Sequence, residues 1–104
     1  MKMYILIKRD VPDKLAPVIA AHASLACYKK FEGDPAMIEW INGIFYEVVC
    51  SVNDKEFENS KSDNKYLVIT ESSLGNQEVA IAFCPREEYS KQFRFFKMWS
   101  PNGS

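Results

Sequence analysis

The hydrophobic pattern of the chain is dominated by one long apolar segment, residues 10–31, which has almost no polar face before Lys29 and Lys30. On a helix that advances about 100° per residue, its small side chains fall in one stripe, and its aliphatic side chains fall in a second stripe on the far side. The small stripe contains Ala16, Ala20, Ala23 and Cys27, and the second stripe contains Leu15, Val18, Ile19, His22 and Ala26. The pattern predicts a helix packed closely on a β-sheet and covered on its far side by more of the chain or by a partner.

Other segments have the patterns of β-strands. Residues 3–7, 66–69 and 79–83 are short continuous apolar runs, which are typical of strands buried on both faces. Residues 44–52 carry apolar side chains at every second position, and this alternation predicts a half-buried strand. The sequence therefore predicts four strands.

Capping residues and prolines separate these elements. Asp34-Pro35 starts a short helix, and Asn53 can cap a short acidic helix. Pro85 ends the last predicted strand and opens a final helix. The packing stripe of that helix contains Tyr89, Phe93 and Phe96. This order of elements predicts a single α/β domain over residues 1–104, with three α/β/α layers and a four-stranded mixed β-sheet.

Composition excludes several classes of protein. The 104 residues have a formal net charge of −1, which gives no general attraction to nucleic acid. No apolar run reaches the length of a membrane span, and the first residues do not resemble a signal peptide. Cys27, Cys50 and Cys84 are an odd number without a close pair, which predicts reduced, buried thiols in a cytoplasmic protein. One histidine and scattered cysteines give no metal-ligand spacing, so no metal and no other cofactor is predicted.

Three residues are candidates for chemistry, and each also has a plainer structural explanation. His22 can act in acid–base catalysis if a carboxylate orients it, and is otherwise a histidine on a helix packing face. Glu71 follows a strand predicted to be buried, at the end of the sheet where α/β folds bind ligands, and can therefore be a site residue. The plainer explanation is a solvated residue at a strand boundary. Lys14 follows the first strand and would reach the same end of the sheet, or is a solvated lysine of a turn.

Several short segments follow one another in a recognisable order. They are Lys-Arg-Asp at 8–10, Ala-Ala-His-Ala-Ser-Leu at 20–25, Glu-Trp at 39–40 with Gly43, residues 48–56, residues 66–71, and the last strand with Pro85. In order and spacing, these segments resemble the type 2 peptidyl-tRNA hydrolases over nearly the whole chain. The resemblance implies the four-stranded mixed sheet of that family.

The positions that carry the chemistry of this family differ here. The catalytic lysine of the family, in a Gly-Lys turn, corresponds to Leu15, with Lys14 one residue away. The helix glutamine of the family corresponds to Ile19, and the aspartate after its third strand corresponds to Glu71. Only His22 matches outright.

Two functions are consistent with this resemblance. The first is a non-catalytic or remodelled dimeric binding module that keeps the hydrolase scaffold. The alternative is an active aminoacyl-ester hydrolase that releases peptides from peptidyl-tRNA. In that case Lys14 would supply positive charge, and Glu71 and His22 would position the water or Lys14 itself.

The expected partners follow from the resemblance and from the charges. The type 2 hydrolases form dimers, so a homodimer is expected. Its candidate contact residues are Tyr28, Phe31, Phe95, Met98 and Trp99. Acidic residues dilute the lysines and arginines along the chain, which predicts weak or no tRNA binding. No binding to DNA or to membranes is expected.

Overall fold

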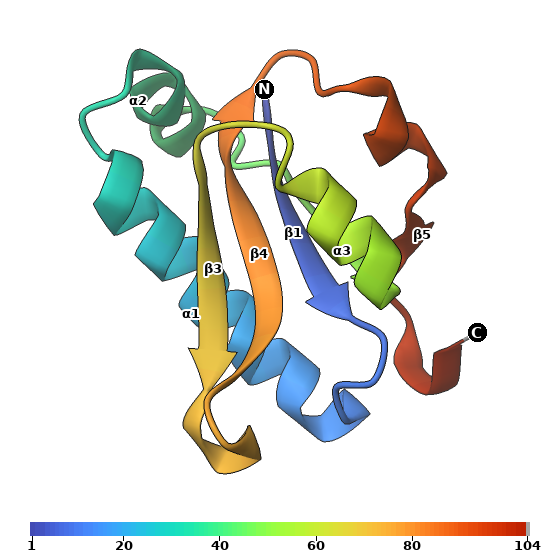
Figure 1. Ribbon diagram of the computed structural model, residues 1–104. Coiled ribbons are helices and arrows are strands. Elements are labelled where there is room, and N and C mark those ends of the chain that lie inside the picture. Colours follow the sequence, from blue (N-terminus) through green and yellow to red (C-terminus); the bar gives the residue numbers. More distant parts are fainter. Residues whose placement is uncertain (104) are drawn as a thin grey trace.

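The apolar run near the start of the chain forms the central strand of the sheet. The computed structural model describes residues 1–103. Its strands and helices are β1 Lys2–Lys8, α1 Ala16–Phe31, α2 Pro35–Asn42, β2 Glu47–Val52, α3 Asp54–Ser60, β3 Tyr66–Glu71, β4 Gln77–Arg86 and β5 Lys97–Met98 (Figure 1). Short 3₁₀ turns lie at Asp13–Leu15, Ser72–Leu74, Lys91–Phe95 and Pro101–Gly103.

All five strands belong to one mixed sheet in the order β3-β4-β1-β2-β5. β1 is parallel to β2 and antiparallel to β4, while β3 pairs antiparallel with β4 and β5 pairs antiparallel with β2. A parallel pair needs a crossover connection, and α1 and α2 supply it between β1 and β2. The predicted α/β domain with one mixed sheet is therefore confirmed.

The side chains of β1 alternate between two cores. Met3, Ile5 and Ile7 pack with residues of α1 and α2, whereas Leu6 packs with residues of α3 and of the C-terminal segment. Accordingly, α1 and α2 cover one face of the sheet and α3 lies against the other (Figure 1). Helices thus cover both faces, as the pattern of the sequence predicted.

Helix α1 packs on the sheet largely through the predicted small residues. Ala16, Ala23 and Cys27 are buried together with Ile19, whereas Ala20 is only half-buried. The predicted second stripe is covered only in part within this chain, since Ile19 is buried but Val18 is 50% exposed and His22 is also exposed. One side of α1 therefore remains open to solvent.

The prediction of four strands and a final helix is wrong. The structure has a fifth short strand, β5, and the segment from Glu87 onwards contains only a 3₁₀ turn before it. Pro85 does not end β4, because the β1–β4 register shifts between Lys2 and Tyr4 and the proline is accommodated at this irregularity.

The aromatic residues that suggested a helical stripe do share one cluster, but without a helix. The Phe93 ring lies 5.0 Å from those of both Tyr4 and Phe83, 4.7 Å from that of Tyr89 and 5.1 Å from that of Phe96. The Tyr89 hydroxyl also lies within hydrogen-bonding distance of the Lys2 and Cys84 carbonyls, at 2.8 and 3.0 Å. Long-range packing against the sheet thus determines the conformation of this segment rather than local helical propensity.

The second strand begins later than predicted. Ile44 and Tyr46 are 88% and 51% exposed, and β2 begins only at Glu47. The cause is Phe45, whose φ of 64° is left-handed and incompatible with an extended strand. Alternation of apolar residues from 44 to 52 therefore overestimated the strand by three residues.

Within residues 1–103, no helix combines the length and apolar character that spanning a membrane requires.

The three cysteines are free and buried, as predicted. Burial raises the pKa of Cys27 to about 12 and that of Cys50 to about 11, and it also raises the pKa of Cys84. We therefore expect thiol reagents to label the folded chain slowly and the unfolded chain completely, because the thiolate is the reactive form. Absorbance after mixing with a chromogenic disulfide, with and without guanidinium, measures this difference.

The same pKa shifts predict a loss of stability in alkaline solution. In the unfolded chain these thiols ionise near their ordinary pKa of 9.0, while the folded chain keeps them neutral. Their contribution to stability is therefore complete below pH 9.0 and declines as the pH rises towards the folded values. Both predictions rest on the burial of the thiols, so rapid labelling of the folded chain by the chromogenic disulfide would contradict them.

Candidate functional site

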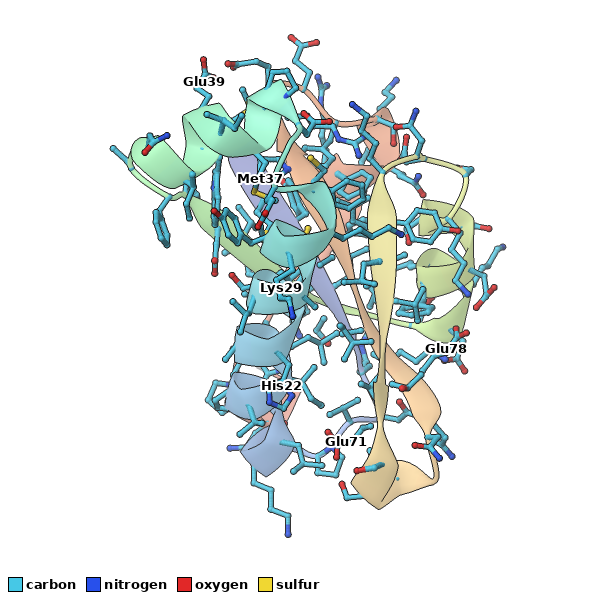
Figure 2. All side chains as sticks on the ribbon, turned by 90° about the vertical axis from the view of Figure 1, so that its left-hand side faces the viewer. His22, Lys29, Met37, Glu39, Glu71 and Glu78 are labelled. Atoms are coloured by element: carbon cyan, nitrogen blue, oxygen red, sulfur yellow. The ribbon has the colours of Figure 1, made fainter. Side chains whose placement is uncertain are left out.

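The three residues predicted from the sequence come from segments at the same end of the sheet, because β1 and β3 run in the same direction and Lys14 lies in the turn after β1. His22 projects from the N-terminal half of α1, and Glu71 is the last residue of the neighbouring strand β3 (Figure 2). Charge on His22 contributes to lowering the pKa of Glu71, although less than the hydrogen bonds to that carboxylate. The structure thus brings His22 and Glu71 close enough to interact electrostatically.

The carboxylate of Glu71 is engaged in a local structural role. Its Oε2 accepts hydrogen bonds from the backbone N–H of Ser73 at 3.1 Å and from the Ser73 hydroxyl at 2.9 Å. These bonds cap the 3₁₀ turn Ser72–Leu74 and are the main cause of the lowered pKa of Glu71. A carboxylate stabilised in its charged form is a weak general base.

Lys14 does not join these two residues. It lies in the 3₁₀ turn Asp13–Leu15 with an exposed side chain. No ion pair or hydrogen bond links it to His22 or Glu71. Over residues 1–103, no group of three or more histidine, cysteine, aspartate and glutamate side chains could hold a metal ion.

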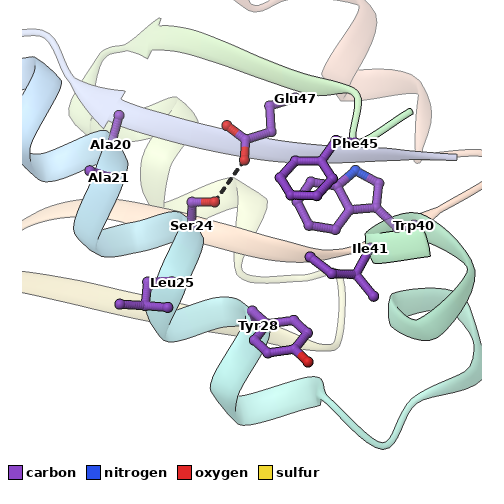
Figure 3. A pocket seen from close by; sticks show the side chains of 9 residues that line it. All are labelled: Ala20, Ala21, Ser24, Leu25, Tyr28, Trp40, Ile41, Phe45 and Glu47. Atoms are coloured by element: carbon purple, nitrogen blue, oxygen red, sulfur yellow. Dashed lines mark hydrogen bonds between the residues drawn. The ribbon is translucent and has the colours of Figure 1, made fainter. Parts of the chain in front are cut away.

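A concave site whose lining contains none of these three residues lies between α1, α2 and the start of β2 (Figure 3). We call it the α1–β2 hollow, and its volume is about 570 Å³. Its walls are formed by Ala20, Ala21, Ser24, Leu25, Tyr28, Trp40, Ile41, Phe45 and Glu47. Binding sites for small molecules and side chains typically have a volume of about 300–1,000 Å³ and a mostly apolar lining.

One wall of the α1–β2 hollow is a rigid pair of aromatic rings. Phe45 stacks on Trp40 with the ring centroids 4.8 Å apart and the planes inclined by 28°. Trp40 is buried, and its indole N–H donates a 2.8 Å hydrogen bond to the carbonyl of Tyr46. Phe45 is held half-exposed on the strained left-handed backbone described above.

The polar groups of the α1–β2 hollow include one carboxylate, that of Glu47, and the hydroxyls of Ser24 and Tyr28. The Ser24 hydroxyl donates a 2.7 Å hydrogen bond to Oε1 of Glu47 (Figure 3). No ion pair joins Glu47 to a lysine or arginine within the described part of the chain. The hollow thus offers an apolar surface next to one uncompensated negative charge.

Reasoning from the sequence missed this site, although part of its signal was present. Ala21, Leu25 and Tyr28 recur at helical spacing on α1, where Ala21 and Leu25 are exposed and Tyr28 is half-buried; only Tyr28 was predicted as a contact residue. The contribution of Phe45 depends on its left-handed φ, which no local pattern indicates.

No protein-family model and no curated protein matches the chain. The resemblance to the type 2 peptidyl-tRNA hydrolases therefore remains a hypothesis, and the candidate sites rest on their geometry.

Proposed function

We propose that this protein is a non-catalytic binding module built on a scaffold like that of the type 2 peptidyl-tRNA hydrolases. The observation that carries the proposal is the α1–β2 hollow, an apolar concavity with one carboxylate that lies apart from the predicted catalytic residues. A rigid aromatic wall and a mostly apolar lining suit binding, because they fix an apolar ligand by packing, and the Ser24–Glu47 pair adds one polar contact.

The state of the predicted catalytic residues supports the same proposal. Hydrolysis of the ester in peptidyl-tRNA needs a group that activates water and a positive charge for the developing oxyanion. Glu71 is stabilised as a carboxylate by Ser73, and Lys14 is not held against Glu71 or His22. The three residues therefore lack the mutual contacts that a catalytic set requires.

The alternative function is an active peptidyl-tRNA hydrolase. The electrostatic interaction between His22 and Glu71 favours it, since a histidine that a carboxylate orients is a common general base. A substrate that recruited Lys14 would complete such a site.

We expect the purified chain to release no more peptide from peptidyl-tRNA than buffer does. The measurement is peptide released from labelled peptidyl-tRNA over time, with His22→Ala and Lys14→Ala variants as matched samples. Release by the wild-type chain that both substitutions abolish would establish the hydrolase and contradict the binding-module proposal.

Affinity for tRNA is a second, independent measurement that distinguishes the binding module from the hydrolase. Acidic residues are interspersed with the lysines and arginines of the chain. We therefore expect its affinity for tRNA to be no tighter than the non-specific range of about 10⁻⁴–10⁻⁶ M at physiological salt. Filter binding at several salt concentrations measures it. Nanomolar affinity with a steep salt dependence would favour the hydrolase.

Self-association is the second part of the proposal. Of the residues expected at a dimer contact, Phe95 and Met98 are 73% and 63% exposed; Met98 belongs to the short edge strand β5, and Phe95 lies just before it. Exposed apolar side chains at a sheet edge favour pairing with another chain. We expect light scattering to give twice the mass of the chain, and a Phe95→Ser/Met98→Ser variant to give the monomer mass. A wild-type chain that stays monomeric up to near-millimolar concentration would contradict the dimer.

A further inference from the structure

We propose that the α1–β2 hollow binds a basic, apolar peptide segment of another protein, whose arginine or lysine pairs with Glu47. This inference rests on the proposed binding function and names the chemistry of the partner. An apolar side chain of the segment would lie against the Phe45–Trp40 wall, and its cationic neighbour would reach the carboxylate.

The charges around the hollow determine the sign of the partner. Glu47 is the only charged residue in the lining, and the Ser24 hydroxyl holds Oε1 in place at 2.7 Å. A cation next to an ordered carboxylate forms a charge-assisted hydrogen bond, whereas an anionic ligand would be repelled. The complementary ligand therefore carries a positive charge next to its apolar part.

The exposed apolar surface favours a peptide over a small molecule. A second hollow, of about 230 Å³, shares Trp40 and Phe45 with the first and is lined further by Met1, Lys2, Glu39, Gly43, Ile44 and Tyr46. Ile44 is 88% exposed there, and Leu25 is 63% exposed at the first hollow. A small molecule in one hollow would leave the other apolar side chain in water, whereas a short segment of chain can cover both.

The charged residues in the two linings show which hollow would bind the arginine or lysine of the peptide. The second hollow is lined by both Lys2 and Glu39, and the Lys2 ammonium is 5.9 Å from the centre of the Tyr46 ring. The charges there are mixed, so they select neither sign. Of these two hollows, only the α1–β2 hollow has an acidic residue and no basic residue in its lining.

The aromatic wall reduces the cost of binding. Phe45 is already fixed by its stack on Trp40 and by its left-handed backbone, so its side chain loses little freedom when a ligand packs against it. Trp40 is buried and anchored through its indole N–H. The wall is therefore formed before the partner arrives.

The test uses three labelled, capped peptides of sequence GLRFLG, GLQFLG and GLEFLG, with affinities measured by fluorescence anisotropy. We expect the arginine peptide to bind most tightly and the glutamate peptide least. Replacing Glu47 by glutamine should weaken the arginine peptide about tenfold, as expected for loss of one charge-assisted hydrogen bond, and leave the glutamine peptide almost unchanged. Glu32→Gln is the matched control, because Glu32 is an exposed acid of the same charge outside the lining.

A second variant tests the location. Ala21 is exposed and lines the hollow, so Ala21→Trp should fill it without disturbing the core and abolish binding of all three peptides. Equal affinity for the three peptides, or equal losses in Glu47→Gln and Glu32→Gln, would overturn the inference. So would a wild-type dimer that Ala21→Trp dissociates, because the occupant would then be a second copy of the chain.

The peptide test can fail separately from the proposed function. Release of peptide from peptidyl-tRNA that depends on Lys14 overturns the binding-module proposal through a different measurement. A preference for arginine that depends on Glu47 supports the inference whether or not such release is seen.

Discussion

Replacing Trp40 by alanine is expected to lower the free energy of unfolding by about 3–5 kcal/mol, the usual cost of truncating a large buried aromatic residue. Trp40 is 3% exposed, belongs to the core beneath α1 and α2, and donates its indole N–H to the Tyr46 carbonyl. The substitution also removes the support of Phe45, so the wall of the α1–β2 hollow is lost with the stability. Chemical denaturation followed by far-ultraviolet circular dichroism measures the change.

Two matched variants separate the parts of this effect. Trp40→Phe keeps most of the buried apolar area but removes the N–H donor, so it should cost less than the alanine variant. Phe45→Gly relieves the left-handed strain and removes the ring stack, two effects of about 1 kcal/mol each and of opposite sign. Its stability should therefore stay close to that of the wild type, while binding at the hollow falls. A Trp40→Ala variant as stable as the wild type would contradict the buried position of the indole.

Replacing Phe93 by alanine is expected to cost a similar amount, about 3–5 kcal/mol. Phe93 is 3% exposed and is the centre of the aromatic cluster that holds the C-terminal segment on the sheet. Its ring touches those of Tyr4 on β1 and Phe83 on β4, so the truncation leaves a cavity between the segment and two strands. Denaturant midpoints in dilute solution give the comparison.

Phe95 provides the control for Phe93 within the same 3₁₀ turn. It is 73% exposed, so at concentrations where the chain is monomeric Phe95→Ala should change the free energy of unfolding by no more than about 0.5 kcal/mol. Equal losses from the two substitutions would mean that the segment does not pack as described.

The elements that the sequence predicted correctly are those with a local cause. Asn53 accepts a hydrogen bond from the Glu56 N–H while the Glu56 carboxylate accepts one from the Asn53 N–H, a complete capping box at the start of α3. The Asp34 side chain accepts a hydrogen bond from the Ala36 N–H at the start of α2. Such contacts span two or three residues, so residue type and spacing are enough to predict them.

The elements that were predicted wrongly depend on contacts between distant residues. Tyr89, Phe93 and Phe96 have a spacing that fits a helix, but their partners on β1 and β4 are not visible in a local pattern. Phe45 adopts a conformation that its residue type disfavours, and it is held there by the ring of Trp40. Neither the loss of the last helix nor the late start of β2 could be deduced from propensity.

The candidate sites show the same division. The carboxyl end of a strand that was predicted to be buried led to Glu71; β3 is a half-buried edge strand, but Glu71 does lie at its end and interacts electrostatically with His22. The role of Glu71 is decided by its hydrogen bonds to Ser73 and by the lack of an ion pair with Lys14, and both depend on turn geometry. The α1–β2 hollow needs Ser24 of α1 to meet Glu47 of β2, a contact that exists only after the crossover has formed.

The position of β1 has a consequence for the order in which the chain folds. β1 leaves the ribosome before the other four strands, yet it lies at the middle of the sheet, and its two neighbours β2 and β4 are synthesised later. Lys2 pairs with Arg86, so the sheet cannot close until most of the chain has emerged. Domains dominated by such non-local pairing fold more slowly than helical bundles of the same size. We therefore expect nascent chains that end before β4 to stay sensitive to protease, and protection to arise in one step after β4 has left the ribosomal tunnel.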